Sequence, residues 1–195
     1  MSQTRAAKLG EKKLLILETI AEALERPAVQ KVTTALLARQ LDVSEAALYR
    51  HFASKAQMYE GLIEFIENGV FSVITQIEAA EESGLKQAEA IVASLLRFAQ
   101  KNRGLTRVLV GDALVNENPR LQARINQLLD RIEATLKQCL KVAAAQGALP
   151  AEHDFSAHAD LLVCHVLGRW QRFVKSGFKD EPLANWPAQW PMLAR

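Results

Sequence analysis

The segment from Asn118 to Gly147 constrains the fold most, because it is the longest stretch with one unbroken apolar period. Its apolar residues recur every three or four positions, as on one face of a helix: Leu121, Ile125, Leu128, Ile132, Leu136, Cys139 and Ala143. Asn118 suits a helix cap, Pro119 the first turn, and Gly147 the end of the helix. A helix of about 28 residues spans roughly 42 Å. We expect it to need a partner in a chain of 195 residues.

A second amphipathic helix is predicted from after Asp154 to Lys175 or Ser176, with Gly177 as its terminator. It has a wide apolar face, and Gly168 lets another backbone come close. Two such helices from each of two subunits would form a four-helix dimer interface. The residues expected in this interface are Leu121, Ile125, Leu128, Ile132, Leu162, Val166, Trp170 and Phe173. The alternative is that both helices only complete the core of the monomer.

Helix signals also fill the rest of the chain. A first helix should end before Pro27, and its apolar face is expected to hold Leu14, Leu15, Leu17, Ile20, Ala21 and Leu24. Ser54 and Gln57 form a capping box for a helix that runs to about Ala80. Another helix is predicted over residues 85–101, followed by a short helix that ends near residue 115. The fold class is therefore expected to be all-α.

Two short predicted helices lie close together near the N-terminus. Thr33 and Thr34 can cap a helix over residues 35–41, and Ser44 can cap another that continues to Phe52. Asp42, between them, tolerates the positive φ that such a turn needs. Two helices joined by about three residues form a helix-turn-helix. Its small core is expected to contain Leu37, Ala38, Leu41, Val43 and Leu48.

The segment LLARQLDVSEAALYRHFASKAQMY, residues 36–59, resembles the DNA-binding domain of the TetR family of bacterial regulators. Three further segments resemble the nucleoid occlusion factors of that family: GLIEFIE (61–67), NRGLTRVLVGDAL (102–114) and RLQARINQLLDRIEATL (120–136). The resemblance implies a helix-turn-helix DNA-binding domain with a basic N-terminal arm at residues 1–58. It also implies a helical dimerisation and regulatory domain at residues 59–195.

The resemblance further implies which residues contact DNA. Those expected at phosphate or sugar are Thr33, Thr34, Ser44, Tyr49, His51 and Lys55, and those expected in the major groove are Glu45, Ala47 and Arg50. A dimer fixes two recognition helices about one DNA turn or a multiple apart. The expected partner is therefore a palindromic double-stranded DNA.

The charge distribution agrees with this placement. Residues 1–58 hold nine Lys or Arg against six Asp or Glu, whereas the remainder holds 15 against 16. Arg5, Lys8, Lys12 and Lys13 form a basic N-terminal arm that can neutralise phosphate or enter a minor groove. The alternative for this arm is a disordered, solubilising tail.

For function, the resemblance implies a nucleoid occlusion factor, which antagonises polymerisation of the division protein FtsZ when it is bound to DNA. The FtsZ-binding surface is expected at Phe65, Lys101 and Asn102. Phe65 could equally be a core residue, and three positions depart from the pattern of these factors: Val73, Ser94 and Arg97. The alternative function is a TetR-type transcriptional repressor whose C-terminal domain holds a small ligand.

Other chemistries are not favoured, and no cofactor is expected. His158 and His165 are seven residues apart, without the tighter spacing of a metal site. Cys139 and Cys164 are expected to be reduced, packed thiols. Catalytic motifs such as GxSxG are not found, and neither is an apolar run of about 18 residues or a secretion signal. We therefore expect a non-enzymatic protein of the cytoplasm, and the resemblance implies association with the nucleoid. The aromatic C-terminal tail is expected to pack irregularly along the domain.

Overall fold

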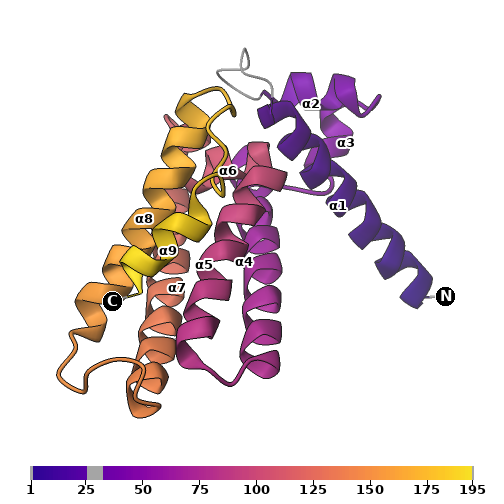
Figure 1. Ribbon diagram of the computed structural model, residues 1–195. Coiled ribbons are helices and arrows are strands. Elements are labelled where there is room, and N and C mark those ends of the chain that lie inside the picture. The colour runs from indigo at the N-terminus through magenta and orange to yellow at the C-terminus, as the bar shows by residue number, and fades with distance from the viewer. Residues whose placement is uncertain (1, 26–32, 195) are drawn as a thin grey trace. The chain divides into compact units, whose positions relative to one another are not determined.

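A computed structural model describes residues 2–25 and 33–194, with the side chains of residues 2–9 left undescribed. Every regular element in these ranges is helical, which confirms the all-α prediction (Figure 1). The elements are α1 (Ser2–Glu25), α2 (Thr34–Gln40), α3 (Glu45–Tyr49), α4 (Lys55–Ala80), α5 (Gly84–Lys101), α6 (Arg103–Leu109), the 3-10 helix η1 (Asp112–Leu114), α7 (Pro119–Ala145), α8 (Phe155–Lys175) and α9 (Trp186–Leu193). None of the helices in the described ranges is long and apolar enough to span a bilayer.

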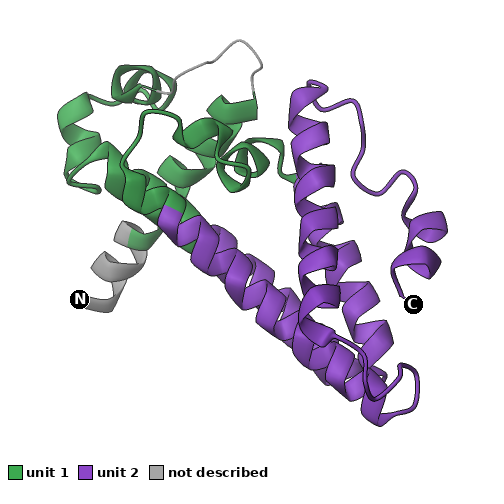
Figure 2. Ribbon diagram, turned by 90° about the vertical axis from the view of Figure 1, so that its left-hand side faces the viewer, with its two compact units in different colours: residues 1–65, 102–122 green, residues 66–101, 123–195 purple. Residues whose placement is uncertain are grey.

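The chain divides into two compact units (Figure 2). The first contains residues 1–65 and 102–122, and the second contains residues 66–101 and 123–195. Helix α4 contributes to both units, and the predicted domain boundary at residue 58 lies inside this helix. The first unit also takes in α6 and η1, which follow the helix-turn-helix by some fifty residues in sequence.

Local signals place the helix ends close to where the sequence predicts them. Asp42 has a φ of 52°, as the turn requires, and Gly177, with a φ of 65°, follows α8. The Asp154 side chain caps α8 by accepting from the backbone N–H groups of the first turn. At the start of α4, Ser54 accepts from the Gln57 N–H, while the Gln57 side chain accepts from the N–H of residue 53, one position before the expected one. The helix ends were therefore determined by short-range interactions.

In the first unit, α6 packs against α1 through a glycine. A Cβ on Gly104 would lie 1.9 Å from the carbonyl oxygen of Ala21, so only glycine permits this approach. The buried apolar side chains in the described part of α1 are Ile16, Leu17, Ile20, Ala23 and Leu24, and Thr19 is buried with them. Leu14 and Leu15, which were expected on the same apolar face, are instead 41% and 54% exposed. The four residues predicted as a basic N-terminal arm, Arg5, Lys8, Lys12 and Lys13, are part of α1, whose backbone is helical from residue 2.

The core of the second unit is formed by the inner faces of its long helices. Helix α5 packs against α8, and the buried Trp170 donates its indole N–H to the Leu95 carbonyl oxygen at 3.1 Å. All eight residues expected at a dimer interface are at most 2% exposed: Leu121, Ile125, Leu128, Ile132, Leu162, Val166, Trp170 and Phe173. Side chains buried in one chain have no surface left for a partner, so that prediction is wrong for this face. The inner faces of both helices therefore belong to the core of the monomer; Leu121 lies in the first unit.

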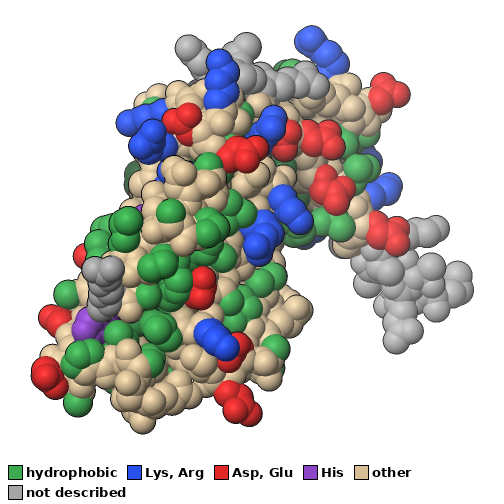
Figure 3. All heavy atoms as spheres, viewed as in Figure 1, with side chains coloured by type: hydrophobic (Ala, Val, Ile, Leu, Met, Phe, Trp, Pro, Cys, Tyr) green, Lys and Arg blue, Asp and Glu red, His purple; other side chains and the backbone are tan. Residues whose placement is uncertain are grey.

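The aromatic C-terminal tail is more regular than expected, because residues 186–193 form α9. Trp186 and Trp190 are buried, with ring centroids 5.4 Å apart. The carbonyl of Leu193 accepts from the ring of His158, whose other nitrogen lies 2.8 Å from His153. Hydrophobic side chains gather over α9 and the neighbouring parts of α8 and α5 (Figure 3). A short polar network therefore fixes the end of an otherwise apolar segment to α8.

Candidate nucleic-acid interface

The helix-turn-helix is held together by a few buried side chains and a closed turn. Leu37, Ala38 and Leu48 are buried between α2 and α3, and the Val43 N–H donates to the Ala38 carbonyl at 2.9 Å. Val43 itself is 43% exposed, so its predicted place in this core is wrong. It lies in the tight turn, where the backbone bond rather than side-chain packing fixes the chain. This closed turn fixes the direction of α3 relative to α2.

Helix α3 presents one face to solvent because Leu48, 1% exposed, anchors the opposite face. Glu45, Tyr49 and Arg50 are all exposed, and Tyr49 retains 44% of its surface. Ala47, two positions after Glu45 and so on another side of the helix, is half-buried. Of the predicted groove residues, Glu45 and Arg50 are therefore exposed, whereas Ala47 is partly covered.

Two of the predicted phosphate contacts serve as helix caps. Thr33 accepts from the Leu36 N–H and Ser44 accepts from the Ala47 N–H, each at 3.2 Å. A hydroxyl oxygen that accepts a capping bond still has its O–H to donate. Both caps are exposed, so the same group can hold the helix and donate to a DNA phosphate.

Thr34 and Glu45 are bonded to each other. The Thr34 hydroxyl donates to the Glu45 carboxylate at 2.6 Å, which ties the first turn of α2 to the first turn of α3. The sequence predicts both as DNA contacts, with no indication of this bond. Glu45 also lies at the N-terminal end of α3, where a negative charge suits the helix dipole.

Lys55 is ion-paired with Glu117, a residue that sequence reasoning missed. The two side chains are 21% and 12% exposed, and the Lys55 ammonium also lies 5.5 Å from the centroid of the Tyr59 ring. Burial, followed by the nearby Glu117 carboxylate, raises the pKa of Tyr59 to about 12. The partners are 62 positions apart, and nothing local in the sequence signals the pair.

His51, the remaining predicted contact, is half-buried at the end of the helix-turn-helix. Its Nδ1 is buried without a hydrogen-bond partner among the described residues. The ring lines a pocket together with Lys12 of α1. Lys12 thus lies beside one of the predicted DNA contacts.

The residues predicted to bind FtsZ are distributed over both units. Phe65 is 43% exposed and is therefore not a core residue. It shares a groove with Asn102 in the first unit, and acidic side chains of α1 border that groove at Glu18, Glu22 and Glu25. Lys101, which precedes Asn102, is exposed and belongs to the second unit.

The histidines considered for a metal site have other neighbours. His158 bonds to His153 and to the Leu193 carbonyl, and burial lowers its pKa. The His165 ring lies 5.9 Å from that of Trp186, and burial lowers its pKa also. The described part of the chain contains no group of three or more His, Cys, Asp or Glu side chains suited to a metal.

The family models match both parts of the chain. The model for bacterial regulatory proteins of the tetR family matches residues 16–62. The SlmA-like model, described as a tetracyclin repressor-like C-terminal domain, matches residues 82–195. The first match contains the entire helix-turn-helix, and the second contains α5 to α9.

Solved structures with the same fold include a TetR transcription regulator from Haloarcula marismortui, with a TM-score of 0.81 and 16% identity over 95% of this chain and 97% of that one. The transcriptional regulator FadR from Bacillus subtilis, solved with stearoyl-CoA, has a TM-score of 0.76 and 15% identity over 93% and 97% of the two chains. At these identities the likeness shows the fold alone.

Similarity in sequence is much higher to proteins named nucleoid occlusion factor SlmA. The protein from Marinomonas sp. (strain MWYL1) is 43% identical, with 96% of this chain and 95% of the relative covered. Those from Aliivibrio fischeri (strain MJ11) and Vibrio cholerae serotype O1 are 47% and 46% identical, with 92% of each chain covered. The chain therefore belongs to the TetR family of bacterial regulators and, within it, to the SlmA nucleoid occlusion factors.

Proposed function

We propose that this protein binds palindromic DNA as a homodimer in the cytoplasm and, when bound, antagonises FtsZ polymerisation over the nucleoid. The observation that carries the proposal is the similarity to nucleoid occlusion factors, which extends over both the DNA-binding region and the C-terminal region. The exposed face of α3 supports it, because this face offers a tyrosine, an arginine and a carboxylate on a rigidly anchored helix.

In the proposed complex, α3 enters the major groove. Glu45, Ala47 and Arg50 read or fill the groove, while Thr33, Thr34, Ser44, Tyr49, His51 and Lys55 contact the phosphate backbone. The Tyr49→Ala variant should weaken binding to all duplexes by about 1 kcal/mol, because a phosphate contact carries no sequence information. Fluorescence anisotropy on a palindromic and a scrambled duplex tests this. A loss confined to the palindrome would place Tyr49 in base readout instead.

Dimerisation requires a different face of α8 from the predicted one. Leu161, Cys164 and Gly168 are exposed at helical spacing, and Leu161 retains 51% of its surface. A Cβ on Gly168 would meet nothing within 4 Å, which leaves room for a second backbone to approach. We propose that this outer face of α8 forms the contact between protomers.

The dimer proposal is tested by placing a charge on the outer face of α8. Leu161→Asp should give a monomer in light scattering coupled to size exclusion, because a buried, unpaired carboxylate is costly at an interface. Met192→Asp is the matched control, since Met192 is 71% exposed on α9. A dimer that persists in Leu161→Asp would exclude this face.

The FtsZ contact is proposed around Phe65, Lys101 and Asn102. An exposed aromatic side chain that borders a groove is typical of a binding site, because burying it on a partner recovers apolar surface. Phe65→Ala should therefore reduce FtsZ binding while DNA binding remains. The control is Met192→Ala, which removes another exposed apolar side chain, one that retains 71% of its surface.

The decisive experiment adds the protein to polymerising FtsZ with and without its selected palindrome. Sedimentation or light scattering should show inhibition that increases with specific DNA, and Phe65→Ala should abolish it. No effect on FtsZ at any DNA concentration would contradict the proposal. The repressor alternative has weaker support, because the transcriptional regulator solved with stearoyl-CoA shares only 15% identity with this chain.

A further inference from the structure

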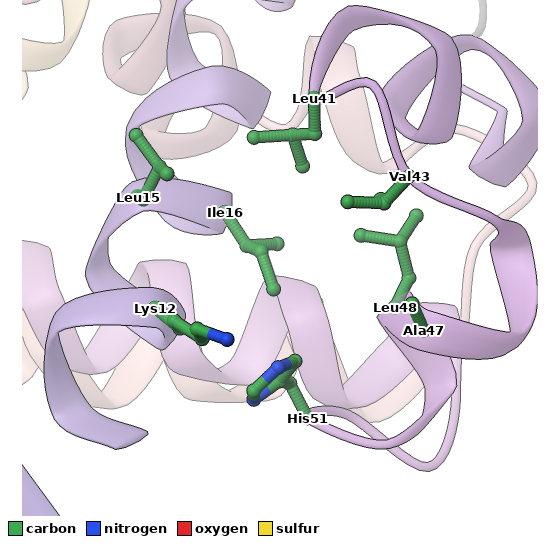
Figure 4. Close-up of a pocket in the computed structure, with 8 residues that line it drawn as sticks. All are labelled: Lys12, Leu15, Ile16, Leu41, Val43, Ala47, Leu48 and His51. Carbon is green, nitrogen blue, oxygen red and sulfur yellow. The ribbon is translucent and has the colours of Figure 1, made fainter. Parts of the chain in front are cut away.

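A pocket lies inside the DNA-binding region, between α1 and the helix-turn-helix, and the proposed function leaves it unused (Figure 4). Its volume is about 180 Å³. The lining residues are Lys12, Leu15 and Ile16 from α1, and Leu41, Val43, Ala47, Leu48 and His51 from the helix-turn-helix. All of them belong to the first unit. An apolar cavity of about 150 Å³ holds a benzene ring, so this pocket has room for one ring with a small substituent.

The pocket has one polar end and one apolar end. Lys12 and His51 lie at the same end, while Leu41 and Val43 lie at the opposite end (Figure 4). No acidic side chain lines it. Among the described residues Lys12 has no carboxylate partner, and the His51 Nδ1 is buried with no hydrogen bond. Leaving a buried polar atom without a partner costs free energy, so a ligand that satisfies it recovers that cost.

We propose that this pocket binds a small aromatic monocarboxylate. The ring lies among the apolar side chains, and the carboxylate accepts from the Lys12 ammonium and from the His51 Nδ1–H. An inorganic anion would leave the apolar walls unused, and a neutral hydrocarbon would leave the two nitrogens unsatisfied. Only a ligand with both parts matches the whole lining.

A bound ligand has a consequence for DNA that rests on the proposed DNA-binding function. Ala47 and His51 belong both to this pocket and to the proposed DNA contacts. A carboxylate held beside them places a negative charge next to phosphate. The ligand should therefore compete with DNA, while its binding to the free protein is independent of that function.

The test is a titration of the protein, free of DNA, with 4-methylbenzoate, followed by NMR of isotopically labelled Ile, Leu and Val methyl groups. Saturable shifts should centre on Ile16, Val43 and Leu48, with a dissociation constant on the order of 1 mM or below for a ligand of this size. The neutral 4-methylbenzamide should bind about tenfold more weakly or worse, as should the Lys12→Met variant, because a charge-assisted hydrogen bond is removed. Inorganic phosphate should not shift these methyl groups.

Two neighbouring residues provide a matched pair of variants. Leu15→Trp should fill the pocket and abolish the shifts, whereas Leu14→Trp should leave them, because Leu14 is similarly exposed but borders the other groove of α1. The proposal fails if no saturation occurs up to about 10 mM, some ten times the expected constant. It also fails if the amide binds as tightly as the acid, or if Leu15→Trp and Lys12→Met both bind as the unmodified chain does. Ligand binding without loss of DNA affinity would overturn only the competition and leave the site in place.

Discussion

The Glu117→Gln variant should bind DNA more tightly than the unmodified protein, although Glu117 lies outside the helix-turn-helix. In the free protein Glu117 holds the ammonium of Lys55, which is the group proposed to contact phosphate. The two side chains are only 21% and 12% exposed, so water screens the pair less than it would a surface pair. Binding DNA through Lys55 therefore requires this pair to be broken.

The magnitude follows from the burial of the pair. Two unit charges about 4 Å apart attract by about 4 kcal/mol at an effective dielectric of 20, and the desolvation of both groups offsets most of this. A net coupling of about 1 kcal/mol remains, which corresponds to a gain of about fivefold in DNA affinity for each protomer when the pair is absent. Lys55→Met should weaken binding by a similar factor and lower the salt slope by about 0.9 for each phosphate that the lysine no longer neutralises.

Fluorescence anisotropy with a palindromic duplex, across a salt series from about 50 to 200 mM, measures both quantities. Asp112→Asn is the charge-matched control, because it removes another carboxylate of the first unit whose partner is Arg107. In a double variant with Lys55→Met, the Glu117→Gln substitution should give no gain. Weaker binding by Glu117→Gln, or an equal gain from the Asp112→Asn control, would refute the reasoning.

Three further predictions concern stability and reactivity. Gly104→Ala should destabilise the protein by about 1–3 kcal/mol or more, because the new Cβ collides with the α1 backbone. Gly69→Ala, in open space on α4, should instead stabilise it by about 0.5–1 kcal/mol. Urea unfolding measures the free energy of unfolding of both variants, and equal effects would contradict the close approach at Gly104. Burial lowers the pKa of His158 in the folded chain, so its contribution to stability is present above the unfolded value near 6.5 and is lost as the pH falls below it. Unfolding midpoints at pH 7.5 and 5.5, roughly one unit either side of that value, should therefore differ more for the unmodified chain than for His158→Gln, and an equal difference would contradict the prediction. In the Leu161→Asp variant, in which the proposed contact between protomers is broken, a maleimide should label the exposed Cys164 before the buried Cys139, whose thiol pKa burial raises to about 11. Loss of labelling when Cys139→Ser rather than Cys164→Ser is added to that variant would contradict this.

The helix-turn-helix was predictable because its determinants are close together in sequence. Thr33 and Ser44 cap helices that begin one residue later, and the turn at Asp42 depends on its own φ. The ends of α7 and α8 follow from Pro119 and Asp154 in the same way. Each of these signals acts within a few residues, so the linear chain contains it in full.

The assignment of apolar faces was less successful, for a general reason. The spacing of the apolar residues around Leu128 in α7 and around Trp170 in α8 shows that one face of each helix is buried, but it does not show what covers that face. The structure covers both residues from within the same chain, whereas the sequence favoured a second subunit. The exposed positions Leu161, Cys164 and Gly168 of α8 also recur at helical spacing, but only Leu161 among them is a large apolar residue, so the sequence does not single this face out.

The sequence by itself determined where helices begin and end, which helix carries the exposed residues that we propose to face DNA, and which family the chain resembles. Only the tertiary structure decided that Lys55 meets Glu117, that His153 and the Leu193 carbonyl enclose His158, and that Lys12 shares a pocket with His51. These partners are distant in sequence or lie on separate elements. A single charged residue or histidine forms no repeating pattern in the sequence, so the sequence does not show which residue it will contact. Their pairing depends on how the helices pack. That packing is determined by hydrophobic burial and by close approaches such as the one at Gly104, which involve residues from several helices.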